Sequence, residues 1–183
     1  MKTSNAILPA LCCLLAFGLS GASAQDAAPA DPGAPRFDRA VMDSCLEHAR
    51  AQQDGGDPAA CIGLASDKCM EEPGGFSTAG MANCLGQERF YWDARLNADY
   101  AKVMANAEAA DAELKALDSA IPGQAPVLRQ MQRDWIAYRD SSCLWEEAQW
   151  QGGTGGIVAA SACAMRLTAQ QALRLEQALQ RDQ

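Results

Sequence analysis

Side chains that commonly carry catalysis are sparse in this chain of 183 residues. His48 is the single histidine, and adjacent carboxylates occur at Glu71–Glu72 and Glu146–Glu147. Neighbouring residues on a helix diverge in direction, so neither pair favours glycoside hydrolysis by two facing carboxylates. The sequence also lacks a nucleophile elbow, a phosphate-binding glycine loop and a dinucleotide fingerprint. We therefore predict a protein that is not an enzyme, without catalytic residues or a cofactor; an unrecognised hydrolase is the third hypothesis.

Cysteines are the other residues with evident chemistry. Two of the eight, Cys12 and Cys13, lie in an apolar run near the N-terminus. The others offer no CxxC pair, and a single histidine is a poor complement for zinc, so we predict no metal site. An even number of cysteines in an exported chain is typical of disulfides. These six residues are Cys45, Cys61, Cys69, Cys84, Cys143 and Cys163.

The spacing of the cysteines suggests how they pair, although six cysteines allow 15 connectivities. Cys143 and Cys163 each lie ten residues from Gly153, in the middle of a glycine turn. Residues equidistant from a turn lie side by side in an antiparallel helix hairpin, and two further turns are flanked by cysteines in a similar way. We expect three local pairs: Cys45 with Cys61, Cys69 with Cys84, and Cys143 with Cys163.

The first 24 residues are predicted to be an export signal. Lys2 supplies the positive start, residues 7–19 form an apolar run too short to span a membrane, and cleavage is expected near Ala24. The mature chain would then have 183 − 24 = 159 residues, enough for one domain with a sizeable core. We expect a periplasmic or secreted protein, with a disordered leader at 25–36, an N-terminal helical hairpin extension at 37–76 and a main helical domain at 77–183.

Removing Lys2 with the signal leaves a net charge of (15 − 1) − 23 = −9. Such an acidic chain is a poor partner for nucleic acid or an anionic membrane surface, and it favours a cationic partner. The alternative, which we prefer, is that the acidity only keeps the protein soluble. We predict no nucleic-acid binding and no membrane insertion.

Hydrophobic residues recur at helical spacing, and no stretch alternates with period two. We predict an all-α fold, an antiparallel helical bundle whose hairpins are stapled by disulfides. A long helix begins near Ser77, its apolar stripe interrupted by Glu88, and a kink or break is expected within 105–111. A helix at about 126–150 places Leu128, Met131, Trp135, Tyr138 and Trp145 on one face. This aromatic face predicts that the helix is the central one, covered by the others.

Two groups of residues could have a role beyond packing. Asp93 and Asn97 share a helix face, and a polar network from them to Arg139 would set the register of two helices. This structural interpretation is preferred to a ligand site. Near the glycine turn, aromatic residues beside a loop could anchor an interface, although packing at the end of the bundle is the preferred interpretation. The candidate binding residues are Trp145, Trp150, Gly153, Thr154 and Gly155.

Two motifs carry a resemblance to a known family. The first is D-x-x-L-N-x-x-Y, formed by Asp93, Leu96, Asn97 and Tyr100; the second is Q-x-x-W-x-x-Y-R-D-x-x-C, formed by Gln132, Trp135, Tyr138, Arg139, Asp140 and Cys143. In order and spacing the chain resembles the lysozyme inhibitor LprI-like family over about 81–179. One departure is Gln171, which stands where family members often carry arginine.

The resemblance implies an exported helical binding module that occludes the cleft of a lysozyme or another peptidoglycan hydrolase. Its motif residues are architectural in this interpretation, and the partner would be a cationic enzyme. The alternative is a periplasmic interaction or stress protein with an unrelated partner. The sequence leaves open the lysozyme class, the contact surface and the oligomeric state.

Overall fold

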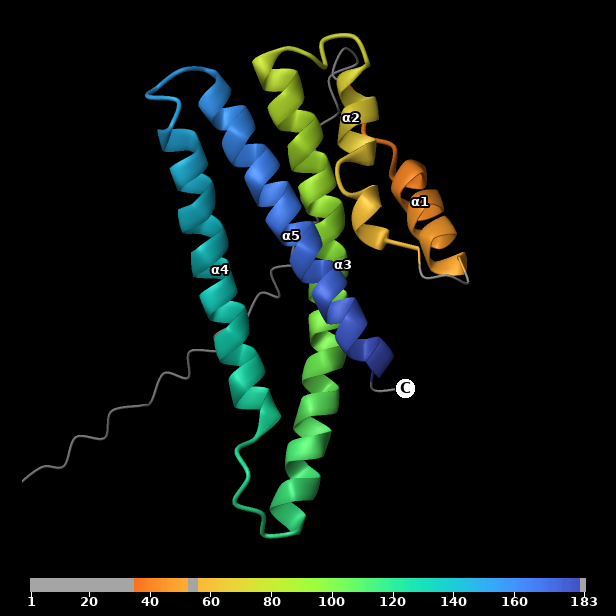
Figure 1. Ribbon diagram of the computed structural model, residues 1–183, viewed down its shortest axis with the longest axis vertical. Helices are drawn as coiled ribbons and strands as arrows, with labels where there is room; N and C mark the ends of the chain where they lie inside the picture. Colours follow the sequence, from red (N-terminus) through yellow and green to blue (C-terminus); the bar gives the residue numbers. More distant parts are fainter. Residues whose placement is uncertain (1–34, 53–55, 182–183) are drawn as a thin grey trace, which may run out of the picture. The chain divides into compact units, whose positions relative to one another are not determined.

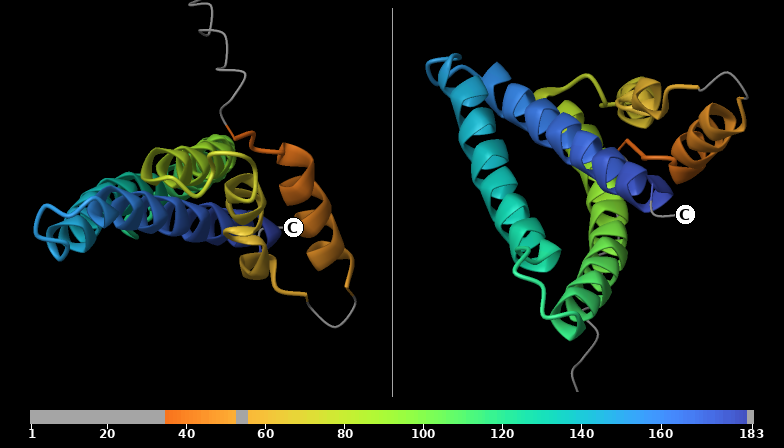
Figure 2. Two further views of the ribbon diagram at one scale, coloured as in Figure 1. Left: turned by 90° about the horizontal axis from the view of Figure 1, so that it is seen from above. Right: turned by 60° about the horizontal axis from the view of Figure 1, so that its bottom comes forward.

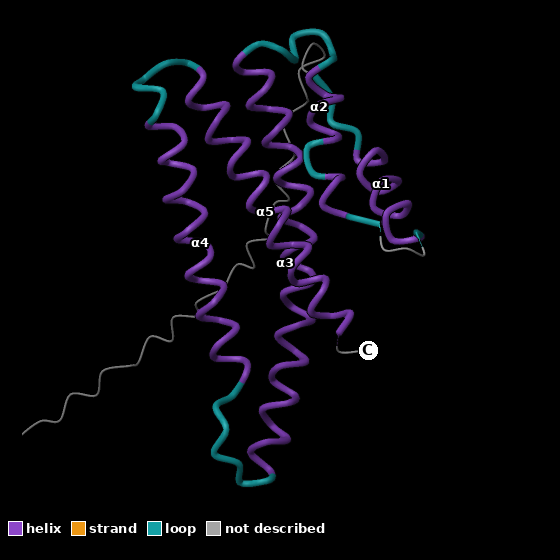
Figure 3. The backbone as a smooth tube through the Cα atoms, in the orientation of Figure 1, coloured by secondary structure: helices purple, strands orange, loops and turns teal. Residues whose placement is uncertain are grey.

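A computed structural model of the protein describes residues 35–52 and 56–181. All regular structure within these residues is helical, as Figure 3 shows, so the predicted all-α class is confirmed. The predicted signal, its cleavage near Ala24 and nearly all of the predicted leader concern residues 1–34, which lie outside the described residues. The elements are α1 (Arg39–Ala51), the 3-10 helix η1 (Pro58–Cys61), α2 (Leu64–Met70), α3 (Thr78–Ala116), α4 (Gln124–Ala148) and α5 (Gly155–Arg181).

Local sequence explains where these helices begin. Asp38 precedes α1 and accepts the Ala40 N–H at 2.9 Å, which satisfies a donor that the helix itself leaves unpaired. Ser77 caps α3 in the same way by accepting the Gly80 N–H. The acidic N-cap Asp57 is followed by a proline at the first position of η1, although the element that forms is a single 3-10 turn.

The helix α3 is continuous over 39 residues, or about 60 Å. The expected break within 105–111 is therefore wrong. The Asp111 carboxylate, inside this stretch, accepts the N–H groups of Gln124 (2.5 Å) and Ala125 (3.0 Å) at the start of α4. Glu108 pairs with Arg129 one turn further along α4. These contacts hold α4 beside the far half of α3, so the long helix has a neighbour along its length.

The central position belongs to α5 rather than to α4, so the predicted centrality of the aromatic helix is wrong. Figures 1 and 2 show α5 crossing α3 between α4 on one side and the α1–α2 segment on the other. Nine residues of α5 are buried, whereas Ala125 and Cys143 are the buried residues of α4. Small residues such as Ala169 and Ala172 let neighbouring helices approach α5 closely, and α4 packs against it from one side.

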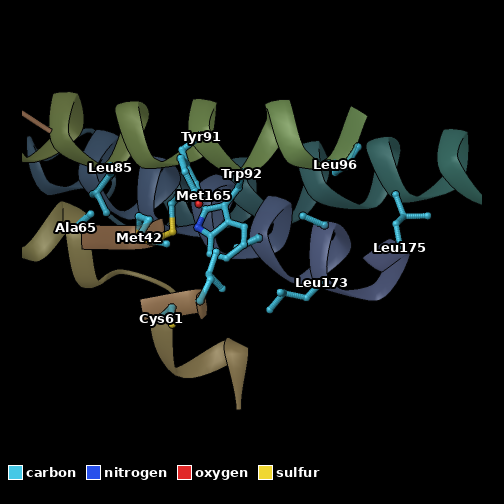
Figure 4. Close-up of a cluster of buried hydrophobic side chains, with 13 residues drawn as sticks. Met42, Cys61, Ala65, Leu85, Tyr91, Trp92, Leu96, Met165, Leu173 and Leu175 are labelled. Atoms are coloured by element: carbon cyan, nitrogen blue, oxygen red, sulfur yellow. The ribbon is translucent and has the colours of Figure 1, made fainter. Parts of the chain in front are cut away.

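The core lies where α1, η1, α2, α3 and α5 meet. Trp92 of α3 is fully buried, with Met42, Cys61, Met165 and Leu173 belonging to the same cluster, as Figure 4 shows. Partly buried Leu128, Met131 and Trp135 bring α4 against the edge of this cluster.

The three predicted disulfides are confirmed. Each joins two consecutive elements across a turn, with Cα–Cα distances between 5.3 and 5.9 Å. Two of them brace the N-terminal elements, and the third closes the α4–α5 hairpin. The pairs are Cys45–Cys61, Cys69–Cys84 and Cys143–Cys163.

Candidate functional site

The turn between α4 and α5 is built by backbone hydrogen bonds. Gly153 N–H donates to the Trp150 carbonyl at 2.8 Å, and Gly156 N–H donates to the Gly153 carbonyl at 3.0 Å. Gln151 and Gly152 both have positive φ, 49° and 85°, which reverses the chain within a few residues. A glycine suits the second of these positions because it has no Cβ to clash.

Trp150 lies against the first residue of α5. A Cβ added to Gly155 would come within 2.2 Å of the Trp150 Cζ3 atom, so a side chain at this position would displace the indole. Trp150 is nevertheless 53% exposed. Because Gly155 has no side chain, the Trp150 ring can pack directly against the turn, while much of the ring remains accessible to solvent.

A groove of about 390 Å³ runs along the same turn. Its most exposed apolar walls are Leu144 on α4 and Ile157 on α5. Sequence reasoning missed both residues, although Leu144 follows Cys143, and consecutive helical residues differ by about 100° in direction. Since Cys143 faces α5 through its disulfide, its neighbour faces away from that contact. The groove is lined by Leu144, Glu147, Ala148, Gly152, Gly153, Thr154 and Ile157.

The structure gathers most of the candidate binding residues at this end of the hairpin. Gly153 and Thr154 line the groove, and Trp150 packs on Gly155 beside it. Trp145 is 66% exposed and does not line the groove. We define the hairpin-end surface as Leu144, Trp145, Trp150, the residues 152–155 and Ile157.

The charges around the hairpin-end surface are negative. Asp140, Glu146 and Glu147 lie on the last turns of α4, and the sequence contains no lysine or arginine between Arg139 and Arg166. The surface thus combines exposed apolar side chains with carboxylates. This composition suits a basic protein partner better than an acidic one.

The two family motifs have structural contacts, but not the predicted network. Asn97 donates to Asp93 within α3 at 3.0 Å. Arg139 pairs with its neighbour Asp140 at 2.8 Å and lies over the Trp135 ring, 4.9 Å from its centroid. The expected polar link from α3 to Arg139 is therefore wrong, because each group finds its partner on its own helix.

A different motif residue joins two helices. Gln132 of α4 accepts a hydrogen bond from the Gln171 side chain of α5 at 3.0 Å. Gln171 is 4% exposed, and its amide nitrogen also lies 3.4 Å from the Met131 sulfur. A neutral amide thus makes the link between α4 and α5 at the position where the resemblance led us to expect arginine. The remaining motif residues Leu96 and Tyr100 are buried and partly buried in the core.

Sequence reasoning also missed the role of Glu88, which it treated as an interruption of an apolar stripe. Its fully buried carboxylate accepts three hydrogen bonds, from Gly63 N–H (2.6 Å), Ser66 N–H (2.8 Å) and the Trp92 indole N–H (3.1 Å). It thereby caps the start of α2 from another helix. Partial burial, followed by the nearby charges of Glu88 and Glu71, raises the pKa of Asp67 in α2.

The described residues contain neither a group of side chains that could bind a metal ion nor a helix that could span a membrane. Residues 35–52 and 56–181 hold no group of three or more histidine, cysteine or carboxylate side chains that could bind a metal ion. No helix in the same part of the chain combines the length and the hydropathy that a bilayer crossing requires.

Comparison with known proteins gives a family match and two relatives. The family described as lysozyme inhibitor LprI matches residues 69–175. An uncharacterized protein of Rhizobium meliloti (strain 1021) is 33% identical over 97 residues, which cover 53% of this chain and 70% of the relative. An uncharacterized 17.7 kDa protein of Rhodobacter capsulatus is 29% identical over 120 residues, covering 65% of this chain and 74% of the relative. No solved structure matches.

Proposed function

Because the chain belongs to the LprI family of lysozyme inhibitors, we propose that it is an exported binding module that inhibits a lysozyme or another peptidoglycan hydrolase. The family match is the observation that carries the proposal. Three disulfides support export, because such bonds persist in oxidising compartments. The proposed location is the periplasm or the extracellular medium, after cleavage near Ala24.

The hairpin-end surface is the proposed contact with the enzyme. Trp145 and Leu144 are each 66% exposed, and large apolar side chains are the usual anchors of protein interfaces. The disulfide Cys143–Cys163 ties the helices that present them, so little ordering entropy is lost on binding. Occlusion of the carbohydrate cleft by this rigid end would inhibit the enzyme without chemistry by the inhibitor.

Acidic side chains around the anchors supply the second part of the recognition. Glu146 and Glu147 would face the basic surface of a cationic lysozyme, whereas Asp140 is already paired with Arg139. Complementary charge accelerates encounter and excludes acidic competitors, while the apolar anchors set the lifetime of the complex. This division of roles makes the proposal testable by separate substitutions.

The decisive experiment measures clearing of a peptidoglycan suspension by c-type, g-type and bacterial lytic enzymes in the presence of the purified, oxidised chain. Inhibition of at least one enzyme at micromolar protein is expected. Trp145→Ala should then raise the inhibition constant by about 30-fold, or on the order of 2 kcal/mol, as expected for an interface hot spot. Leu117→Ala, which removes a similarly exposed large apolar side chain just beyond the C-terminal end of α3, is the matched control and should leave inhibition unchanged.

Three outcomes would contradict the proposal in different ways. Absence of inhibition against all enzyme classes would favour an envelope interaction or stress protein with an unrelated partner. Equal loss in the Trp145 and Leu117 variants would remove the assignment of the contact to the hairpin end. Peptidoglycan hydrolysis by the chain alone, abolished by a single carboxylate substitution, would instead identify an enzyme.

A further inference from the structure

A pocket of about 340 Å³ lies where the chain at the start of α1 meets the N-terminal half of α3. Its walls are mainly aromatic. The Phe37 and Tyr91 rings pack with centroids 6.3 Å apart, and Phe90 is 63% exposed at the rim. The lining residues are Phe37, Arg39, Gln87, Phe90, Tyr91 and Ala94.

Two guanidinium groups lie close to these rings: that of Arg39, which lines the pocket, and that of Arg89, which lies beside Phe90 outside the lining. The Arg39 Cζ atom lies 5.6 Å from the Tyr91 centroid, and the Arg89 Cζ atom lies 4.7 Å from the Phe90 centroid. Neither arginine forms an ion pair with a carboxylate of residues 35–52 or 56–181. Both distances are within the range of a cation–π contact, and the planar fork of N–H donors on a guanidinium matches the geometry of a carboxylate.

The other charged groups near Tyr91 are already engaged. The Arg95 Cζ atom lies 5.7 Å from the Tyr91 centroid, and its guanidinium is 4.0 Å from Glu176. Asp43 accepts a hydrogen bond from the Tyr91 hydroxyl at 2.7 Å. The unpaired charge that lines the pocket is therefore that of Arg39, with Arg89 next to Phe90 outside the lining, within a chain whose net charge is −8.

These features define the chemistry of a ligand. A carboxylate would satisfy the guanidinium donors, and the electron-rich faces of the aromatic rings attract the C–H groups of a saturated ring. The Gln87 amide can both donate to and accept from hydroxyl or acetamido groups. The pocket volume is at the lower end of small-molecule sites and suits one ring rather than a chain of rings.

We propose that the pocket between the segment before α1 and α3 binds a carboxylate-bearing monosaccharide unit, with Arg39 and Arg89 on the carboxylate and Phe37 and Phe90 on the sugar ring. Such a unit occurs in cell-wall glycan as muramic acid and in other polysaccharides as a uronic acid. The site is separate from the hairpin-end surface, and its existence does not depend on hydrolase inhibition.

The test is an NMR titration of the full mature chain, without any hydrolase, by four probes. N-acetylmuramic acid is expected to shift the amide signals of residues 37–39 and 87–94. N-acetylglucosamine has the same ring without the lactyl carboxylate, and it should bind about tenfold more weakly or not at all, because the charge-assisted bonds are missing. Glucuronic acid distinguishes a general acidic-sugar site from one specific for the muramic acid substituent. Acetate reports binding of the carboxylate alone and should be the weakest anion.

Substitutions assign the contacts. Arg39→Gln and Arg89→Gln should each weaken N-acetylmuramic acid binding by about tenfold, whereas Arg166→Gln, at an exposed position on α5, is the matched control and should not. Phe90→Ala should weaken the sugar but not acetate. The inference is overturned if no probe binds, if the neutral sugar binds as tightly as the acidic one, or if acetate binds as tightly as the sugar. It is also overturned if all three arginine variants weaken binding equally. Failure of hydrolase inhibition alone leaves these outcomes unaffected.

Discussion

Glu88 illustrates how a polar residue in an apolar stripe can organise a fold. Its carboxylate reaches from α3 to the start of α2, where Gly63 and Ser66 present backbone N–H groups, and it also receives the Trp92 indole N–H. All three partners are donors, so an acceptor with two oxygens satisfies them without water. The residue therefore links a short helix, the long helix and the central tryptophan.

Glu88→Gln should lower the free energy of unfolding by on the order of 2 kcal/mol, because the new amide group is itself a donor and would leave a buried N–H without an acceptor. Thermal unfolding followed by circular dichroism is the measurement. Glu72→Gln, which removes a charge from an exposed position near the end of α2, is the control and should have little effect. Equal melting of the Glu88 variant and the parent chain would show that the buried contacts are not needed.

Tyr91 gives a prediction about alkaline pH. Burial, supported by the hydrogen bond to Asp43, raises the pKa of Tyr91 to about 12 from 10.0. Below pH 10 the hydroxyl is protonated in both folded and unfolded chains, and its contribution to stability is fully present. Between pH 10 and 12 the unfolded chain loses the proton first, so this contribution falls as pH rises.

The Tyr91→Phe chain should consequently show a shallower decline of melting temperature from pH 10 to 12 than the parent, even if it is less stable at neutral pH. The compared quantity is the slope of melting temperature against pH. Loss of the Asp43 hydrogen bond lowers the melting temperature over the whole range, whereas ionisation of Tyr91 changes the slope. Tyr138→Phe, at an exposed position on α4, is the control. Parallel slopes in parent and Tyr91→Phe would contradict the assigned shift.

At the level of elements, the size of the side chains indicates which helix is central better than the number of aromatic residues does. The central helix is α5, which is rich in alanine, and not the aromatic-rich α4. The apolar side of α4 is wider than its contact with α5: Leu128 and Trp135 pack against the core, while Tyr138 and Trp145 remain exposed. The smaller side chains of α5 allow contact on several sides. The aromatic helix is therefore peripheral, and its connection to α5 depends on a disulfide and the Gln132–Gln171 hydrogen bond.

Replacing Cys143 and Cys163 together by serine should lower the free energy of unfolding by about 3 kcal/mol in the chain-entropy description, since the bridge closes a loop of 20 residues. Urea unfolding of the double variant measures the loss. Hydrogen exchange should also increase more in α4 than in α1, because α4 buries few residues and relies on this link. Uniform acceleration over all helices would show instead that α4 unfolds only with the whole molecule.

For the molecule as a whole, charge is distributed unevenly despite the net value of −8. Glu146 and Glu147 lie near the hairpin end in a stretch of sequence without lysine or arginine, while Arg39 lines the pocket beside Phe37 and Phe90 without an ion pair to a described carboxylate. The two surfaces favour ligands of opposite charge. A chain could thus engage a basic enzyme and an acidic sugar at separate places, which is the joint consequence of the two proposals.

Association with a cationic hydrolase should slow as salt increases, because dissolved ions screen the attraction between the acidic surface and the enzyme. Near 0.1 M salt the screening length is about 10 Å. Glu146→Gln with Glu147→Gln should reduce the association rate several-fold at low salt and change dissociation less. Surface plasmon resonance at several ionic strengths gives both rates. The control is Glu113→Gln with Asp118→Asn, which removes the same amount of charge from exposed positions near the C-terminal end of α3, away from the hairpin-end surface. Equal effects of both double variants would indicate net charge rather than a local surface.

The sequence by itself determined the all-α class, the three disulfide pairs and the family, because helical periodicity, turn positions and motif spacing are local properties of the chain. Only the tertiary structure decided that α5 is central, that α3 continues unbroken, that Arg139 pairs within its own helix and that Glu88 caps α2. Each of these depends on which helix faces pack together across long sequence separations. Helical spacing shows which face of a helix is apolar, but not which other helix packs against that face. The groove at Leu144 and Ile157 and the arginine–aromatic pocket arise in the same way, from residues whose proximity the folded helices create.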